Sequence, residues 1–128
     1  MNYVEVHDFR RLREVMRDPA TWPGSGMKGP EDFPFDVDPP AGTRVFVFDK
    51  SQGVAVFLPT SGGYDVHLAL TTEARGPEAV EVCKRLLKTE FRNTLIFSKP
   101  PAGRRDVIAF AIAVGFSRIS KDTLCLSL

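Results

Sequence analysis

The chain has 128 residues and a mass of 14.2 kDa, which fits one domain and leaves no room for a second independent core. Its 43% hydrophobic and 26% charged residues are typical of a globular protein and exclude a disordered or collagen-like chain. Seventeen basic and sixteen acidic residues give a net charge of +1, which disfavours nucleic-acid binding.

Neither a membrane span nor export is expected. No apolar run approaches the roughly eighteen residues of a membrane-spanning helix. The N-terminal residues lack the apolar segment of a signal peptide, so a cytoplasmic location is predicted.

The two cysteines and two histidines predict no metal site. Cys83 and Cys125 lie in apolar patterns, so both are expected to be buried free thiols. A closed zinc site needs about four nitrogen or sulfur ligands, and His7 and His67 are isolated in sequence.

The N-terminal segment predicts a strand followed by a helix. Residues 3–7 alternate between apolar and polar, and Asp8 can cap a helix from Phe9 to about Arg17. The apolar residues of this helix share one face: Phe9, Leu12, Val15 and Met16.

Residues 19–42 predict one long irregular loop, because they hold ten of the twenty glycine and proline residues. Trp22, Met27, Phe33 and Phe35 make this segment apolar enough to pack as a flap with a single helical turn. The aromatic residues are candidates either for the wall of a substrate pocket or for anchors of the loop itself.

Three strands follow the loop. Residues 44–50 and 53–59 are β-branched and aromatic runs, and Ser51-Gln52 joins them as a hairpin. Residues 63–70 alternate after a short turn, so the three strands form an antiparallel meander.

The C-terminal half predicts two helices among short strands. Residues 76–91 have a helical period, with Gly76 as the N-cap and Pro77 in the first turn. Residues 94–99 form a short buried strand. Residues 104–114 are apolar nearly all round, which predicts a helix buried on most sides and ended by Gly115. Two final strands are expected at 117–120 and 123–128.

This order of elements predicts a mixed, layered α/β sheet over residues 1–128. The order, with VHLALTTEARGPEAVEVCKRLLKTEF (66–91) and IAFAIAVGFSRIS (108–120), resembles the GNAT superfamily of N-acetyltransferases. The resemblance is greatest to small GNAT-like proteins of tailed bacteriophages, and it covers residues 44–128, with a looser match before them.

The resemblance implies a mostly antiparallel central sheet flanked by helices. It also implies acetyl-CoA as cofactor and direct transfer of its acetyl group to an amine, which is either a small molecule or a protein. A homodimer is compatible with it. The alternative is a catalytically inactive GNAT-fold protein that acts by binding or has a structural role.

In the family, the CoA pyrophosphate lies at the N-terminus of the helix after the central strand, where free amides and the helix dipole attract anions. Arg75 matches the first position of the family's pattern, whereas Glu78 and Val80 replace its small residues. A second interpretation is that Gly76 and its neighbours form only a well-capped helix start. The cofactor-binding residues implied are Leu70, Thr71, Thr72, Arg75, Gly76, Glu78, Ala79 and Arg104.

His67 is the candidate general base, because it lies on the central strand and its side chain titrates near neutral pH. A structural role for this histidine is the alternative. The family's acid is a tyrosine beyond the second helix, but this chain has none after Tyr64. Ser117 and Ser120 are the hydroxyl-bearing residues of the right region.

Overall fold

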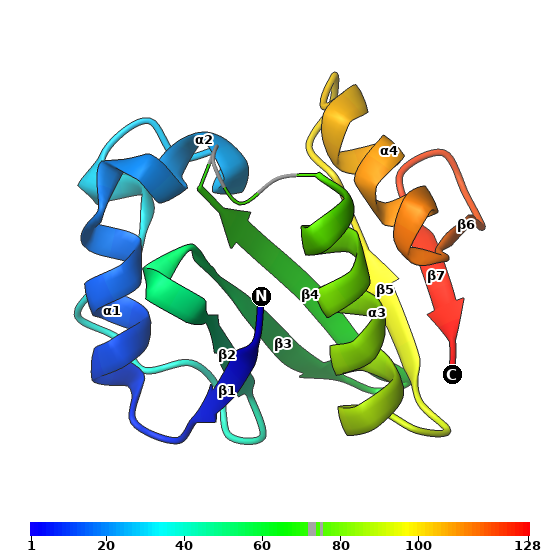
Figure 1. The fold of residues 1–128 in the computed structure, drawn as a ribbon, viewed down its shortest axis with the longest axis horizontal. Helices are drawn as coiled ribbons and strands as arrows, with labels where there is room; N and C mark the ends of the chain where they lie inside the picture. Colours follow the sequence, from blue (N-terminus) through cyan, green and yellow to red (C-terminus); the bar gives the residue numbers. More distant parts are fainter. Residues whose placement is uncertain (72–73, 75) are drawn as a thin grey trace.

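The computed structural model describes residues 1–71, 74 and 76–128. Within them a seven-stranded sheet runs in the order β1-β2-β3-β4-β5-β7-β6 (Figure 1). Only β4 and β5 pair in parallel among the described strands, so the sheet is mixed and mostly antiparallel. The strands are β1 (Tyr3–Val6), β2 (Arg44–Phe48), β3 (Gly53–Thr60), β4 (Gly63–Leu70), β5 (Leu95–Ser98), β6 (Ser117–Arg118) and β7 (Leu124–Ser127).

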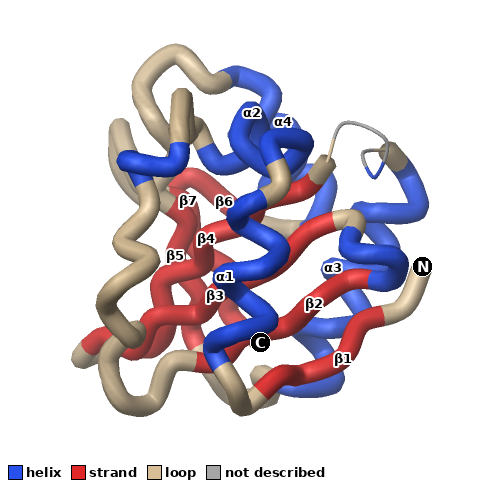
Figure 2. The backbone as a smooth tube through the Cα atoms, turned by 90° about the vertical axis from the view of Figure 1, so that its left-hand side faces the viewer, coloured by secondary structure: helices blue, strands red, loops and turns tan. Residues whose placement is uncertain are grey.

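Four α-helices of the described chain cover the two faces of this sheet, and the predicted order of elements is confirmed. Figure 2 shows α1 in front of the strands, with α2 continuing from its upper end. Helices α3 and α4 pack on the other face, around a second core cluster. The helices are α1 (Phe9–Arg17), α2 (Trp22–Ser25), α3 (Pro77–Glu90) and α4 (Arg105–Val114).

Helix α1 forms as its sequence predicts. The Asp8 side chain accepts a hydrogen bond of 2.9 Å from the Arg10 amide, which satisfies one of the free amides of the first turn. Its apolar stripe packs on the alternate residues of three strands, and this removes apolar surface from water. The buried residues of this cluster are Leu12, Val15, Met16, Val45, Val47, Val54 and Ala69.

The opposite face is built around aromatic rings under α3. The rings of Phe57 and Phe91 have centroids 4.3 Å apart, and Phe46 meets Phe57 edge-on at 5.7 Å. The inward residues of α3 fill the rest of this cluster: Ala79, Val82, Cys83, Leu86 and Leu87. The helical period of the sequence therefore identified the buried face of α3.

The loop at 19–42 has more regular structure than expected. It contains α2 and two turns of 3₁₀-helix, at Pro19–Thr21 and Pro30–Asp32. Thr21 is fully buried, and its hydroxyl donates to the Asp18 carbonyl oxygen at 2.8 Å. Buried hydrogen bonds of this kind hold the segment against α1.

The prediction that the 104–114 helix is buried on most sides is wrong. In α4 only Ala111 and Val114 are buried, and Ile112 is 55% exposed. The helix lies at the margin of the sheet and packs on one side only (Figure 1). Cys125, expected to be buried, is half-buried, because only the two-residue strand β6 lies beyond β7.

Other predicted boundaries also shift. The 44–50 strand ends at Phe48, because a 3₁₀ turn follows in which Lys50 has a left-handed backbone with φ of 56°. The 94–99 strand is not fully buried, since Leu95 is 39% exposed. Among the described residues no helix has both the length and the apolar character to cross a bilayer, and no cluster of potential metal ligands occurs.

Candidate functional site

Strands β4 and β5 are joined at one end and diverge at the other. Their parallel pairing covers only Tyr64 with Ile96 and Asp65 with Phe97, while β4 continues to Leu70. Gly63 makes the close end possible, because a Cβ atom there would lie 2.1 Å from the Leu95 carbonyl oxygen. The two strands therefore form a V that opens toward the start of α3.

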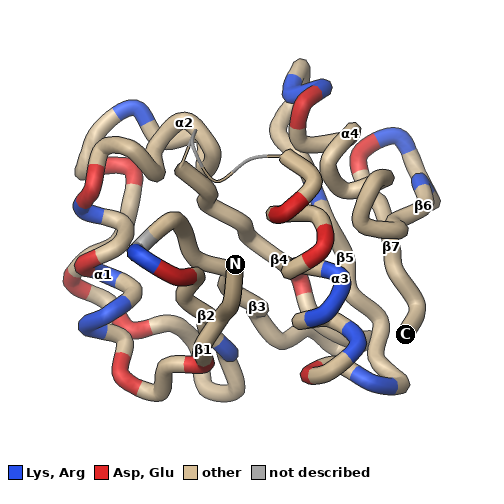
Figure 3. The backbone as a smooth tube through the Cα atoms, viewed as in Figure 1, with Lys and Arg blue, Asp and Glu red and all other residues tan. Residues whose placement is uncertain are grey.

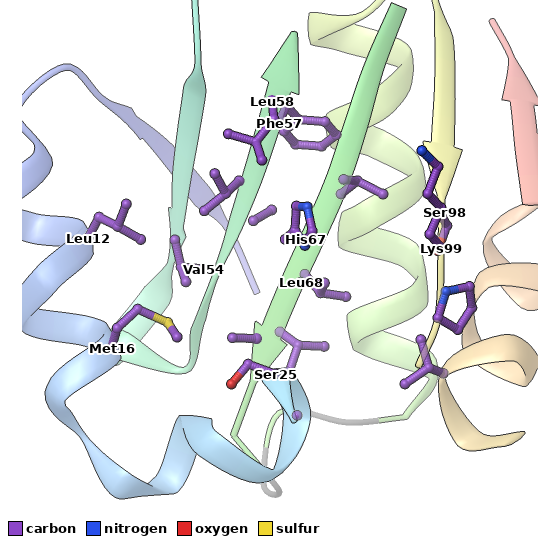
Figure 4. A pocket seen from close by; sticks show the side chains of 18 of the residues that line it. Leu12, Met16, Ser25, Val54, Phe57, Leu58, His67, Leu68, Ser98 and Lys99 are labelled. Carbon is purple, nitrogen blue, oxygen red and sulfur yellow. The ribbon is translucent and has the colours of Figure 1, made fainter. Parts of the chain in front are cut away.

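A cavity of about 1000 Å³ occupies this opening, and its lining comes from both faces of the sheet. Figure 4 shows side chains from α1 and β3 on one side of β4 and from β5 on the other. Because the same cavity touches both faces, it passes through the sheet where β4 and β5 separate. On the α1 side it is lined by Leu12, Met16, Val54, Val56 and Leu58, and on the α3 and α4 side by Cys83, Leu87, Val114 and Phe116.

His67 lies on β4 at the centre of this cavity, directly opposite Val56 of β3 (Figure 4). Its side chain is open to water but surrounded by the cavity walls, and this partial desolvation lowers its pKa below the ordinary value of 6.5. The charge of Asp65 opposes the shift and that of Lys99 adds to it. The imidazole is therefore neutral at pH 7 and able to accept a proton.

Asp65 shares the face of His67, two residues back along β4. Its Oδ2 atom lies 3.6 Å from Nζ of Lys99, which follows the end of β5. Lys99 and Ser98 were not among the predicted site residues, yet both line the cavity, and Ser98 of β5 is buried. The available signal in the sequence was that the predicted strand at residues 94–99 ends at these two residues.

The predicted pyrophosphate site at the start of α3 lies beyond the residues that line the cavity. Gly76 has a φ of +123°, and a Cβ atom there would meet nothing within 4 Å, so the backbone is open to a ligand. Pro77 has no amide hydrogen. The Glu78 carboxylate accepts from the N-terminal ammonium of Met1 at 2.5 Å, and Ala79 is fully buried.

Only some of the remaining predicted cofactor residues line the cavity. Leu70 and Arg104 line the cavity. Thr71 is buried, and its amide donates to the Gln52 carbonyl oxygen at 2.9 Å. Thr72 and Arg75 lie outside the described residues.

Arg104 is held by a neighbour rather than presented to solvent. Its guanidinium donates to both carboxylate oxygens of Asp106 at 3.0 Å. This bidentate hydrogen bonding lowers the pKa of Asp106 to about 2. The pair fixes the start of α4 at the edge of the cavity.

The aromatic residues of the loop divide in the same way. Phe33 lines the cavity, whereas the indole nitrogen of Trp22 donates to the Met16 carbonyl oxygen at 2.8 Å. The rings of Phe35 and Phe33 have centroids 4.7 Å apart, and Cζ of Arg17 lies 5.0 Å from the centroid of the Phe35 ring in a cation–π contact. Trp22 and Phe35 therefore anchor the loop, and Phe33 forms part of the wall.

The serines expected near the site are not in the cavity. Ser117 and Ser120 are exposed residues of β6 and the turn after it. Cys83 does line the cavity, but burial raises the pKa of its thiol to about 12. It remains a protonated thiol at neutral pH and is a poor nucleophile.

The residues present fit an acyl-CoA, which the GNAT resemblance implies. An apolar cavity that passes between two diverging strands can receive an extended acyl chain and its pantetheine arm. The first-turn amides of α3 have no partner within their own helix, and Glu78 turns its charge toward Met1. The diphosphate would then meet the backbone at residues 76–79.

The fold, with its V-shaped opening between the parallel strands β4 and β5, is similar to that of a solved GNAT-family acetyltransferase. A crystal structure of an acetyltransferase of the GNAT family from Staphylococcus aureus Mu50 matches with a TM-score of 0.66. The match covers 98% of this chain and 99% of that chain, at 9% sequence identity. No family model and no curated protein matches the sequence. The predicted GNAT-like fold is therefore confirmed.

Proposed function

We propose that the protein is an acyl-CoA-dependent N-acetyltransferase that holds acetyl-CoA between β4 and β5. The observation that carries this proposal is the cavity of about 1000 Å³ that passes through the sheet where these strands separate. Because its lining comes from both faces of the sheet, an activated acyl group and an acceptor can lie on different sides of β4 within it. The phage likeness, the homodimer and the cytoplasmic location remain predictions of the sequence.

The reaction follows from the position of His67. Bound acetyl-CoA supplies an acyl carbon activated as a thioester. The amine approaches from the α1 side, and its nitrogen bonds to that carbon while the carbon–sulfur bond breaks and sulfur keeps the electron pair. The neutral imidazole of His67 takes the proton that the nitrogen loses. The sulfur leaves as a thiolate and takes its proton from water in the open cavity, and the hydroxyl of Ser98, which lines the cavity from β5, can donate a hydrogen bond to it.

The alternative is a GNAT-fold protein that binds a partner without catalysis. Two features of α3 favour it: Pro77 removes one amide donor, and Glu78 places a carboxylate in the first helical turn. Both weaken an anion site at that position. Cofactor binding therefore distinguishes the two functions.

Isothermal titration with acetyl-CoA tests the proposal. We expect saturable binding at or below millimolar concentration. Replacing Glu78→Gln removes a negative charge beside the diphosphate and should tighten binding about two- to fivefold. Glu81→Gln, on the next turn of the helix, is the matched control and should leave affinity unchanged, since helix-terminal effects fade within a turn. If none of the three proteins gives binding heat up to millimolar acetyl-CoA, the acetyltransferase proposal is refuted. The non-catalytic binding protein is then the function that remains.

A further inference from the structure

The α1 side of the cavity is an apolar chamber. Its floor is the sheet surface around His67, one wall is α1, and the other is the loop at 19–42 (Figure 4). Seven of its lining residues, from three separate segments, carry hydrocarbon, aromatic or thioether side chains, and the polar Ser25 also lines it. The seven are Phe9, Leu12, Met16, Met27, Phe33, Val56 and Leu58.

Charged residues surround this apolar chamber, and most of them form ion pairs with one another. Figure 3 shows charges along α1, the adjoining loop and the start of α4, while β3 and β4 are mostly uncharged. Asp32, which also lines the cavity, accepts from the Lys28 amide at 2.7 Å. Three ion pairs lie at the rim: Arg13 with Asp38, Lys99 with Asp65, and Arg104 with Asp106.

This arrangement decides which amines the chamber can hold. Burying a second ammonium group among apolar walls is costly unless a carboxylate pairs with it, and three of the nearby carboxylates, Asp38, Asp65 and Asp106, already have a cationic partner. An apolar body gains free energy for each methylene that it buries. A polyamine or an amino sugar therefore fits poorly, and a hydrocarbon chain fits well.

We propose, resting on the function proposed above, that the acceptor is a monoamine with an apolar body, such as a medium-chain alkylamine or an arylalkylamine. The amine lies at His67, and the body lies in the apolar chamber between α1, β3 and the loop. Specificity then comes from Val56, Leu58 and Phe33 rather than from a charged group.

The test measures amine binding to the protein without acyl-CoA, by calorimetry and by NMR of the imidazole groups. The chain has two histidines, so the signals of His67 can be followed beside those of His7 as an internal reference. The probes are butylamine, octylamine, and octane carrying an amine at each end.

We expect octylamine to bind about 100-fold more tightly than butylamine, from four additional buried methylenes. The diamine should bind at least about tenfold more weakly than octylamine. Octylamine should shift the signals of His67 and leave those of His7 in place. Equal binding of the diamine, no dependence on chain length, or an unshifted His67 would each overturn the proposal.

Two valine variants locate the binding site. Val56→Asp places a carboxylate opposite His67 and should reverse the preference in favour of the diamine. Val4→Asp makes the same change at an edge-strand residue that is 59% exposed, and it should leave both affinities unchanged. If Val56→Asp does not fold, the isosteric Val56→Thr should weaken octylamine binding about threefold, and unchanged affinity would place the site elsewhere.

Failure of this inference is distinct from failure of the proposed function. Acetyl-CoA binding without selective monoamine binding refutes the acceptor class alone. Octylamine binding without acetyl-CoA binding keeps the monoamine site and refutes the acetyltransferase.

Discussion

His67 combines access to water with a partly desolvated position, and this combination sets its protonation. Burial disfavours the charged imidazolium, so its pKa in the folded protein lies below 6.5. The unfolded chain then binds more protons at pH values below about 6.5, and folding stability falls as the pH drops through that window. Above about pH 6.5, His67 makes no pH-dependent contribution to folding stability.

We therefore predict that His67 titrates below pH 6.5 when its imidazole signals are followed by NMR. Asp65→Asn should lower the midpoint further, because that carboxylate favours the charged form, and Lys99→Gln should raise it. In urea unfolding, His67→Gln should lose less stability than the parent between about pH 7 and about pH 5. A midpoint at or above 6.5 would contradict the desolvated environment.

Some residues at the site were identifiable from sequence and others were not. His67 stood out because a histidine in the central strand is chemically distinctive. Glu78 could be placed in the first turn of a helix, but its contact with Met1 joins residues 77 positions apart in the chain. Arg104 was predicted beside the cofactor, and its pairing with Asp106 depends on the local turn into α4.

At the scale of elements, the opening between β4 and β5 depends on a close approach at its other end. Gly63 has a φ of +157°, and a Cβ atom there would lie 2.1 Å from the Leu95 carbonyl oxygen, so any side chain at this position would meet backbone atoms. The parallel pair can then form over two residues before the strands separate.

We predict that Gly63→Ala destabilises the fold by about 3 kcal/mol, from backbone strain and the clash with Leu95. Gly62→Ala is the matched control, because a Cβ atom there meets nothing within 4 Å, and it should change stability by less than about 0.5 kcal/mol. The measurement is the free energy of unfolding in urea. Equal stability of the two variants would show that the close approach at Gly63 does not hold β5 in place.

Helix α4 shows why periodicity alone misjudged an element. Its residues are apolar on most sides, which predicts burial, yet Ile112 faces outward. Hydrophobicity indicates which residues tolerate burial, whereas the position of a helix at the sheet margin decides how many neighbours it has. For α3, by contrast, the helical period was sufficient to predict the buried residues, because that helix crosses the middle of the sheet.

At the scale of the whole molecule, two hydrophobic clusters lie on opposite faces of one sheet and are connected by the cavity. A ligand that spans this opening contacts both clusters and binds only the folded state. Binding of that kind must stabilise the protein by mass action.

We predict that acetyl-CoA at about 100 times its dissociation constant raises the melting temperature by about 8 °C. Pantetheine, which lacks the diphosphate, is the control ligand and should give a smaller rise at equal concentration. The measurement is thermal unfolding followed by circular dichroism. An unchanged melting temperature at millimolar acetyl-CoA would contradict cofactor binding.

The sequence by itself determined the order of the elements, the buried faces of α1 and α3, and the GNAT-like class of the fold. These depend on local periodicity, caps and turns, which neighbouring residues specify. Only the tertiary structure decided that the cavity passes through the sheet, that Ser98 and Lys99 face it, and that the rim charges pair with one another. Those features arise where distant segments meet, and pairing between such segments leaves no periodic signal along the chain.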